Sequence, residues 1–255
     1  SKSVKRTDVL MMGALATSGA TAGYVVASKV AMLLLVGHQL MNLVLTPRVG
    51  RFLDQEKKEA VQQEYHQSRV VGLSFAMGGT CVLAIGGPWI LSLFGEYAEA
   101  LPVILVLAAT YVIQVSFGMC GGYLNIAGYA NWTLATTGMV LLLNVVLNAA
   151  LIPVLGAAGA ALAMLASITA TNAFTAYLVL RLDGVQTYSR WIAGVVAATT
   201  GLLVLAAFGP LSHIQAGGAL LIVVAAFLWS EAAFIQSLVH ACSEALWHVV
   251  SERRL

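Results

Sequence analysis

Residues 22–47, AGYVVASKVAMLLLVGHQLMNLVLTP, decide the fold, because Lys29 is the one charged side chain among them. An α-helix needs ~20 mostly apolar residues to cross the hydrocarbon core of a bilayer. Similar apolar runs recur about five more times along the chain, and no alternating strand pattern competes with them. The stretch and its repeats predict an all-α, polytopic helical membrane protein.

The overall composition leads to the same class. Hydrophobic residues make up 60% of the 255 residues and charged residues 9%, and the mean hydropathy is +0.88. Soluble domains carry about 25% charged residues, so an ordinary soluble domain is excluded. The net charge of +2 gives no reason to expect nucleic acid as a partner. Cys81, Cys120 and Cys242 have unrelated spacing, which predicts thiols without a disulfide or a metal.

The apolar runs predict about seven to eight membrane helices, the first of them truncated. The first run is short and the sequence begins with Ser, so we expect the N-terminus of a longer protein to be missing. We expect the charged residues 48–69 to form a helix along the membrane surface. The expected membrane segments are 9–22, 23–47, 70–94, 102–127, 132–151, 157–180, 191–208 and 217–238.

Basic residues mark one side of the membrane. They gather in residues 48–69, in residues 181–190 and at the C-terminal end, whereas the connections 96–101, 153–156 and 209–218 contain no Lys or Arg. Loops rich in Lys and Arg stay in the cytoplasm. We therefore expect a multi-pass protein of the cytoplasmic membrane with its C-terminus in the cytoplasm.

Polar side chains line one face of the second segment, within about 100° at helical spacing, and Lys29 lies beside them. Two interpretations remain open. The stripe is either a hydrated substrate path, or a set of interhelical hydrogen bonds with Lys29 reaching toward the membrane surface. The residues of the stripe are Tyr24, Ser28, His38, Gln39, Asn42 and Thr46.

Two other segments carry polar groups that are costly in lipid. Asn144 and Asn148 share a helix face, from which they bond to another helix or contact a sugar. Glu231 is acidic within an apolar run; it carries a proton, neutralises Lys29, or lies close enough to the interface to be hydrated. By contrast, small residues at spacing four, Thr171 among them, indicate helix packing.

Motifs of enzyme chemistry are missing from the sequence. It contains no HExxH zinc motif, no GxSxG nucleophile motif and no phosphate-binding loop. The acids in residues 48–69 alternate with bases, as on a solvated helix. We therefore expect no catalytic residues, no metal site and no cofactor, and we look for transport.

Four passages, taken in order, resemble the polysaccharide-exporter or oligosaccharide-lipid flippase branch of the MATE-like (multidrug/oligosaccharidyl-lipid/polysaccharide) superfamily, in its C-terminal half. The first, DVLMMG at 8–13 with AGY at 22–24 and ASK at 27–29, resembles the family's seventh helix and the start of its eighth. The others are PWILSLFGEY at 88–97, NIAG at 125–128, and NVVLN at 144–148 with LIP at 151–153 and GAAGAA at 156–161. They resemble the ends of the ninth and tenth helices, and the eleventh with its turn into the twelfth.

The resemblance implies two six-helix lobes that rock around a central cavity. This chain would supply the second lobe in residues 1–182, two additional membrane helices in 183–240 and a cytoplasmic amphipathic tail in 241–255. Its implied partners are membrane lipids and the missing N-terminal lobe of the same protein.

The implied activity is translocation of lipid-linked oligosaccharide or polysaccharide precursors by alternating access, without covalent chemistry. The implied substrate is an undecaprenyl-diphosphate-linked glycan, whose diphosphate meets basic side chains at the positions of Lys29 and Arg6. Asp8 matches the acidic residue of the seventh helix. Together with the polar faces above, the expected substrate-binding residues are Arg6, Asp8, Lys29, Gln39, Asn42, Asn144 and Asn148.

Two alternatives stay open. A multidrug cation antiporter of the same superfamily requires a carboxylate centred in the cavity, for which Asp8 is the candidate. A non-transporting membrane subunit of a glycan assembly complex, such as a polymerase, ligase or scaffold, requires a large outer loop, and every expected outer loop is short.

Overall fold

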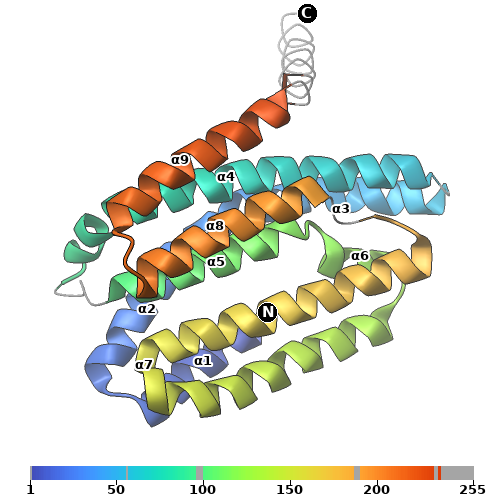
Figure 1. Cartoon of the computed structure of the whole chain (residues 1–255). Coiled ribbons are helices and arrows are strands. Elements are labelled where there is room, and N and C mark those ends of the chain that lie inside the picture. The colour runs from blue at the N-terminus through green and yellow to red at the C-terminus, as the bar shows by residue number, and fades with distance from the viewer. Residues whose placement is uncertain (1, 56, 96–99, 187–189, 233–234, 237–255) are drawn as a thin grey trace, which may run out of the picture.

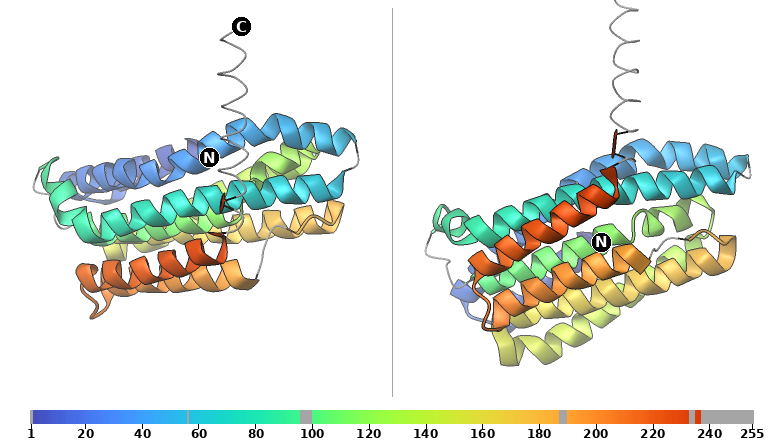
Figure 2. Two further views of the ribbon diagram at one scale, coloured as in Figure 1. Left: turned by 90° about the horizontal axis from the view of Figure 1, so that it is seen from above. Right: turned by 45° about the horizontal axis from the view of Figure 1, so that its top comes forward.

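The computed structural model describes residues 2–55, 57–95, 100–186, 190–232 and 235–236, and the side chains of residues 2–6, 15 and 190 are outside this description. The described residues form helices and contain no strand. This confirms an all-α protein. The helices run roughly side by side (Figures 1 and 2). They are α1 Lys2–Leu15, α2 Ser18–Met32, η1 Leu33–Leu35, α3 Val36–Asp54, α4 Lys58–Ser92, α5 Leu101–Ser116, α6 Cys120–Ile126, α7 Ala130–Asp183, α8 Arg190–Phe208 and α9 His213–Ser230.

The second expected segment is longer than its apolar run, because α2, η1 and α3 follow one another without a loop over Ser18–Asp54. The side chain of Thr17 caps the start by accepting a hydrogen bond from the backbone N–H of Ala20. The 3₁₀ turn Leu33–Leu35 interrupts the α-helical spacing, since a 3₁₀-helix has 3.0 residues per turn. Residues before and after it therefore do not share one helix face.

The charged residues 48–69 do not form a separate surface helix, and that expectation was wrong. They are divided between the end of α3 and the start of α4, which meet in a short turn at one end of the bundle. Helix α4 continues through Pro88 and ends at Ser92. Both helices extend because alternating charges are compatible with a solvated helix end, so the charge pattern did not mark a boundary.

The centre of the bundle is α5, almost all of whose side chains are buried. It contacts α2, α4, α7 and α8. After Ser116 the chain bends by 41° into the short α6. Gly118 provides the bend with a φ of +62°, a conformation that costs little only for glycine.

The long helix α7 is a hairpin of two antiparallel arms (Figure 1). The reversal is at Gly156, whose φ of 56° and ψ of −131° are not helical. The arms pack so closely near the turn that a Cβ at Gly159 would collide with the backbone oxygen of Leu151. Each arm exceeds the ~20 residues that a membrane span requires.

Within the described ranges, five helices are long and apolar enough to span a membrane, or six if α5 and α6 form one bent span. The sequence predicted seven to eight. The counts differ chiefly because α7, counted as one helix, doubles back at Gly156. The expected polytopic membrane protein is confirmed, whereas the expected tail 241–255 lies outside the described residues.

The two last helices pack against the rest of the bundle. Helix α8 lies on α5, and α9 lies on α4 and on α8 (Figure 2). The turn between α3 and α4, the turn between α6 and α7 and the end of α7 lie together at one end of the bundle (Figure 1). The basic segments 48–58 and Arg181 therefore share one end, as the sequence predicted; its cytoplasmic placement stays a prediction.

Candidate functional site

A buried carboxylate lies between α1, α2 and the first arm of α7. Asp8 is 1% exposed. Its Oδ2 accepts a hydrogen bond from the Tyr24 hydroxyl at 3.2 Å, and its Oδ1 accepts one from Asn148 Nδ2 at 2.7 Å. Asn148 Nδ2 also donates to Asn144 Oδ1 at 3.0 Å, and both asparagines are fully buried. Three residues that the sequence predicted for the site, Asp8, Asn144 and Asn148, thus form one network.

Helical spacing explains how this network forms. Asn144 and Asn148 are four residues apart, so both point from α7 toward α1. Their amides meet the side chain of Asp8, and hydrogen bonds to a charged partner contribute about 1.5–3 kcal/mol each. Two atoms of the network, Asn144 Nδ2 and Asn148 Oδ1, are buried without a hydrogen-bond partner in the described structure.

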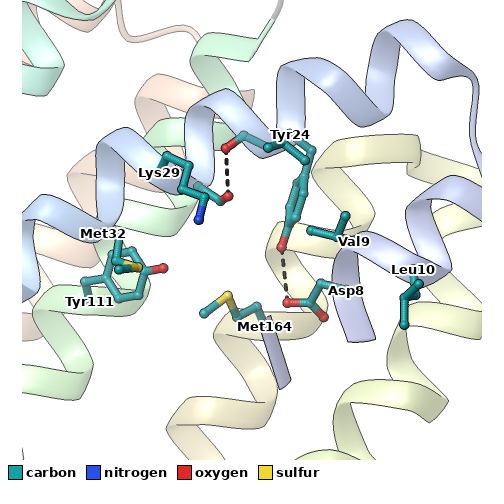
Figure 3. Close-up of a pocket in the computed structure, with 10 residues that line it drawn as sticks. Asp8, Val9, Leu10, Tyr24, Lys29, Met32, Tyr111 and Met164 are labelled. Carbon is teal, nitrogen blue, oxygen red and sulfur yellow. Dashed lines mark hydrogen bonds between the residues drawn. The ribbon is translucent and has the colours of Figure 1, made fainter. Parts of the chain in front are cut away.

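Lys29 borders the same region from α2. A pocket of about 420 Å³, here called the lysine pocket, has Asp8, Tyr24 and Lys29 as its lining polar groups, together with Ser28 (Figure 3). Lys29 is exposed, and the described part of the chain offers it no ion pair. The remaining wall is apolar or aromatic, formed by Val9, Leu10, Val25, Met32, Tyr111 and Met164.

The remaining predicted site residues lie elsewhere. Gln39 is exposed and does not line the lysine pocket. Asn42 lines a second pocket further along α3. Arg6 belongs to α1, but its side chain is outside the described residues. The polar stripe of the second segment is therefore divided, because the 3₁₀ turn separates Tyr24 and Ser28 from the polar residues of α3.

The second pocket has a volume of about 250 Å³ and lies between α3, α5, α6 and both arms of α7. We call it the neutral pocket, since none of its lining residues is Asp, Glu, Lys or Arg. Sequence reasoning missed Gln114 and Asn172 and interpreted Thr171 as a packing residue. The available signal was Thr171 and Thr175 at spacing four on one helix face, both of which line this pocket.

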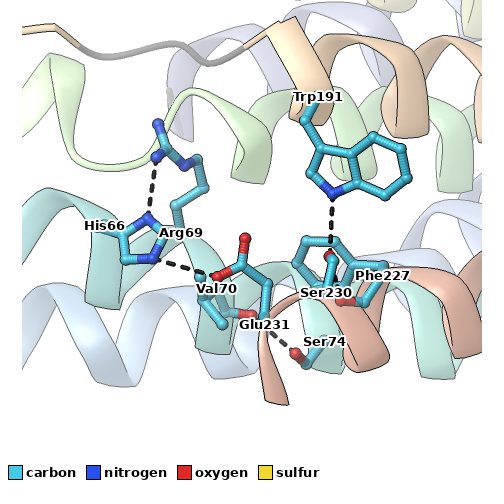
Figure 4. A network of polar contacts seen from close by, with 8 residues as sticks. All are labelled: His66, Arg69, Val70, Ser74, Trp191, Phe227, Ser230 and Glu231. Carbon is cyan, nitrogen blue, oxygen red and sulfur yellow. Dashed lines mark hydrogen bonds and ion pairs between the residues drawn. The ribbon is translucent and has the colours of Figure 1, made fainter. Parts of the chain in front are cut away.

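Glu231 has a different partner from those proposed for it. Its Oε2 lies 3.2 Å from His66 Nε2, and Arg69 Nη2 lies 3.2 Å from the other ring nitrogen of His66 (Figure 4). The suggestion that Glu231 neutralises Lys29 was therefore wrong. Nearby, the indole N–H of Trp191 donates to Ser230 Oγ at 3.0 Å. These contacts join the end of α9 to α4 and α8.

A third set of hydrogen bonds lies at the end of the bundle where the basic segments are. Asp183 accepts hydrogen bonds from the hydroxyls of Tyr123, at 2.8 Å, and Tyr129, at 2.9 Å. The hydrogen bond to Asp183 raises the pKa of Tyr129, so this phenol remains a donor to a higher pH than an unpaired tyrosine. Gln62 exchanges two hydrogen bonds with the backbone of Gln186. These bonds join the two ends of α7 to each other and tie its C-terminal end to α6 and α4.

Cysteine and metal chemistry have no support among the described residues. Neither Cys81 nor Cys120 forms a disulfide there, and Cys242 lies outside the description. The described ranges also contain no group of three His, Cys, Asp or Glu residues able to hold a metal ion. The polar networks that the structure describes are instead small groups of hydrogen-bonded and ion-paired side chains, such as Asp8 with Tyr24, Asn144 and Asn148, and His66 with Arg69 and Glu231.

The MatE family model matches residues 2–150, more than half of the chain. This chain belongs to the MatE family. The family consists of membrane transporters and flippases rather than enzymes, so the protein is a multi-pass membrane transport protein. The matched range contains the whole Asp8 network and Lys29. No curated protein and no solved structure gives a significant match.

Proposed function

We propose that the protein flips lipid-linked oligosaccharide or polysaccharide precursors across the cytoplasmic membrane by alternating access. The undecaprenyl-diphosphate-linked glycan is the proposed substrate, and Lys29 is the residue that meets its diphosphate. Residues 1–182 are the proposed second lobe, residues 183–240 the additional helices, and the missing N-terminal lobe the partner that completes the cavity.

The observation that carries this proposal is Lys29 on the lysine pocket. A charged side chain within a membrane helix costs about 2.5–3.5 kcal/mol unless it is hydrated or paired. Lys29 has no acidic ion-pair partner among the described residues, and its pocket is otherwise mainly apolar. A cation beside an apolar wall suits an amphiphile that has an anionic head and a hydrocarbon tail.

One observation favours a second candidate, a multidrug cation antiporter. Asp8 is a buried carboxylate on the same pocket, with the Oδ1 atom of Asn148 unpartnered beside it in the described structure. Such oxygens attract a cationic drug or a coupling cation. The two candidates therefore assign opposite dominant charges to one pocket: Lys29 for a diphosphate, or Asp8 for a cation.

Substitution of Lys29 in the full-length protein separates the two candidates. We expect Lys29→Arg to keep glycan export, whereas Lys29→Gln and Lys29→Glu lose it at equal membrane abundance. Lys57→Gln is the matched control, because Lys57 is exposed at the start of α4, far along the chain from the lysine pocket. The assay measures surface glycan in cells that lack the native gene, with drug resistance measured in parallel.

Each result points to one candidate. Full export by Lys29→Gln would refute a role of Lys29 in phosphate recognition. Loss of drug resistance in Asp8→Asn cells, with glycan export unchanged, would replace the flippase by the antiporter. Lys29→Glu should then leave resistance intact, since an added carboxylate does not repel a cation.

A further inference from the structure

The neutral pocket lies directly beside the lysine pocket along the same helices. Tyr111 lines the lysine pocket and Gln114 the neutral pocket, three residues later on α5. On α7, Met164 lines the lysine pocket and Ile168, four residues later, lines the neutral pocket. These steps correspond to about one helical turn, ~5 Å. A ligand whose charged group lies at Lys29 and which extends along α5 and α7 therefore enters the neutral pocket.

The lining of the neutral pocket does not suit an ion. No carboxylate, lysine or arginine lines it, and His38 is the one titratable imidazole there. Asn42 Nδ2 contacts His38 Nε2 at 3.0 Å, and Asn42 Oδ1 accepts from Ser68 Oγ at 3.5 Å, which orients the amide with its NH₂ toward the ring. Nε2 must then accept, so the ring is neutral when this bond forms.

Several polar atoms of this lining have no partner in the described structure. Thr171 is 9% exposed, and its Oγ1 is buried without a hydrogen bond. Asn172 Nδ2 is likewise buried and unpartnered. A buried polar group left unsatisfied costs about 1–3 kcal/mol. Both atoms are covered in the conformation described, so a ligand with hydroxyl or amide groups would pair with them after the side chains rotate toward the pocket, whereas a hydrocarbon chain would leave them unpaired.

Two glycines keep the pocket open on the side of α6. Gly121 and Gly122 line it, and no heavy atom lies within 4 Å of the position that a Cβ would occupy at either one. Any larger side chain there would project into the open space. The volume of about 250 Å³ is below the ~300–1,000 Å³ of pockets for drug-sized ligands, so a single ring fits better than a chain of rings.

From this geometry we infer that the neutral pocket binds one sugar residue of the substrate whose diphosphate lies at Lys29. The inference rests on the proposed function and deepens it, since it assigns the first part of the glycan to a site built from α3, α5, α6 and α7. The neutral pocket recognises the sugar by hydrogen bonds to its hydroxyl and amide groups, and no charged side chain of the pocket takes part.

The test compares soluble ligands with and without a sugar. The full-length protein is purified in detergent, and its affinity is measured by calorimetry for farnesyl diphosphate and for its glucose and N-acetylglucosamine conjugates. The Gly122→Leu variant fills the neutral pocket. Gly138→Leu is the matched control, because Gly138 is also helical with open space at its Cβ position but does not line the pocket. Both changes favour helix formation, so neither should prevent folding.

We expect one of the sugar conjugates to bind wild type about tenfold more tightly than farnesyl diphosphate. Gly122→Leu should lose this preference and keep its affinity for farnesyl diphosphate, Gly138→Leu should keep both, and Lys29→Gln should weaken all three ligands. An equal affinity of wild type for all three ligands, or an unchanged preference in folded Gly122→Leu, would overturn the inference while leaving the diphosphate site intact. Failure of wild type to bind farnesyl diphosphate at all would overturn the proposed function itself.

Discussion

Replacing Asn148 by alanine should destabilise the protein more than any exposed asparagine substitution on the same helix. Asn148 is fully buried, and its Nδ2 donates to Asp8 at 2.7 Å and to Asn144 at 3.0 Å. A hydrogen bond to a charged group contributes about 1.5–3 kcal/mol and a neutral one about 0.5–1.5 kcal/mol. Loss of both bonds should therefore cost roughly 2–4 kcal/mol if Asp8 is ionised.

The double-mutant cycle with Asp8→Asn separates the charged bond from the rest. In the Asp8→Asn background, the Asn148→Ala change should cost at least about 1 kcal/mol less, because it no longer removes a donor from a carboxylate. The measurement is chemical unfolding of the purified full-length protein in detergent, followed by tryptophan fluorescence. Asn131→Ala is the control, since Asn131 is exposed near the start of the same arm of α7.

Two results would refute this reasoning. The first is an Asn148→Ala cost within about 0.5 kcal/mol of Asn131→Ala, the usual range for surface substitutions. The second is additivity in the cycle, which would mean that the carboxylate of Asp8 does not depend on the amide of Asn148.

Two further predictions test the fold. Gly159→Ala should destabilise the protein by about 1–3 kcal/mol, because the added Cβ meets the backbone oxygen of Leu151. Gly138→Ala should not, since the space around Gly138 is open. Equal unfolding free energies for the two variants would contradict the close packing of the α7 arms. The raised pKa of Tyr129 means that the Tyr129–Asp183 bond stabilises the protein fully below the unfolded pKa of about 10 and is lost as pH rises through the higher folded value. Ultraviolet titration, with Tyr129→Phe used to assign the signal, should show Tyr129 ionising at lower pH in Asp183→Asn, and an unchanged titration would count against the bond.

The membrane spans could be predicted from the sequence because lipid imposes a length and a composition on each helix. Lys29 was easy to select as a candidate, because it is the one charged side chain in the apolar run of residues 22–47. The 3₁₀ turn at Leu33–Leu35 could not be predicted, since three leucines fit either helix type. Nor could the division of residues 48–69 between α3 and α4, because the same charges suit one surface helix or two protruding helix ends.

The candidate site was predictable in part, since buried polar groups require partners and therefore stand out in apolar runs. That reasoning selected Asn144 and Asn148, and the resemblance to the flippase branch selected Asp8. The three residues meet although they lie up to 140 residues apart. It did not select Gln114 or Asn172, because their convergence depends on the bend after α5 and on the return of α7 at Gly156. Both features come from single glycines with positive φ, which periodicity does not reveal.

For two sets of polar residues, the structure goes beyond the sequence-based interpretation for the same physical reason. The sequence offered sugar contacts or helix packing for Asn144 and Asn148 and slightly favoured packing; in the structure Asn148 Nδ2 donates hydrogen bonds to Asn144 and to Asp8. Thr171, which spacing assigned to packing, has its hydroxyl unpartnered on the neutral pocket. The cost of a polar group in lipid identifies the side chains that need a partner. Only the packing of the helices decides whether that partner is another side chain or a ligand.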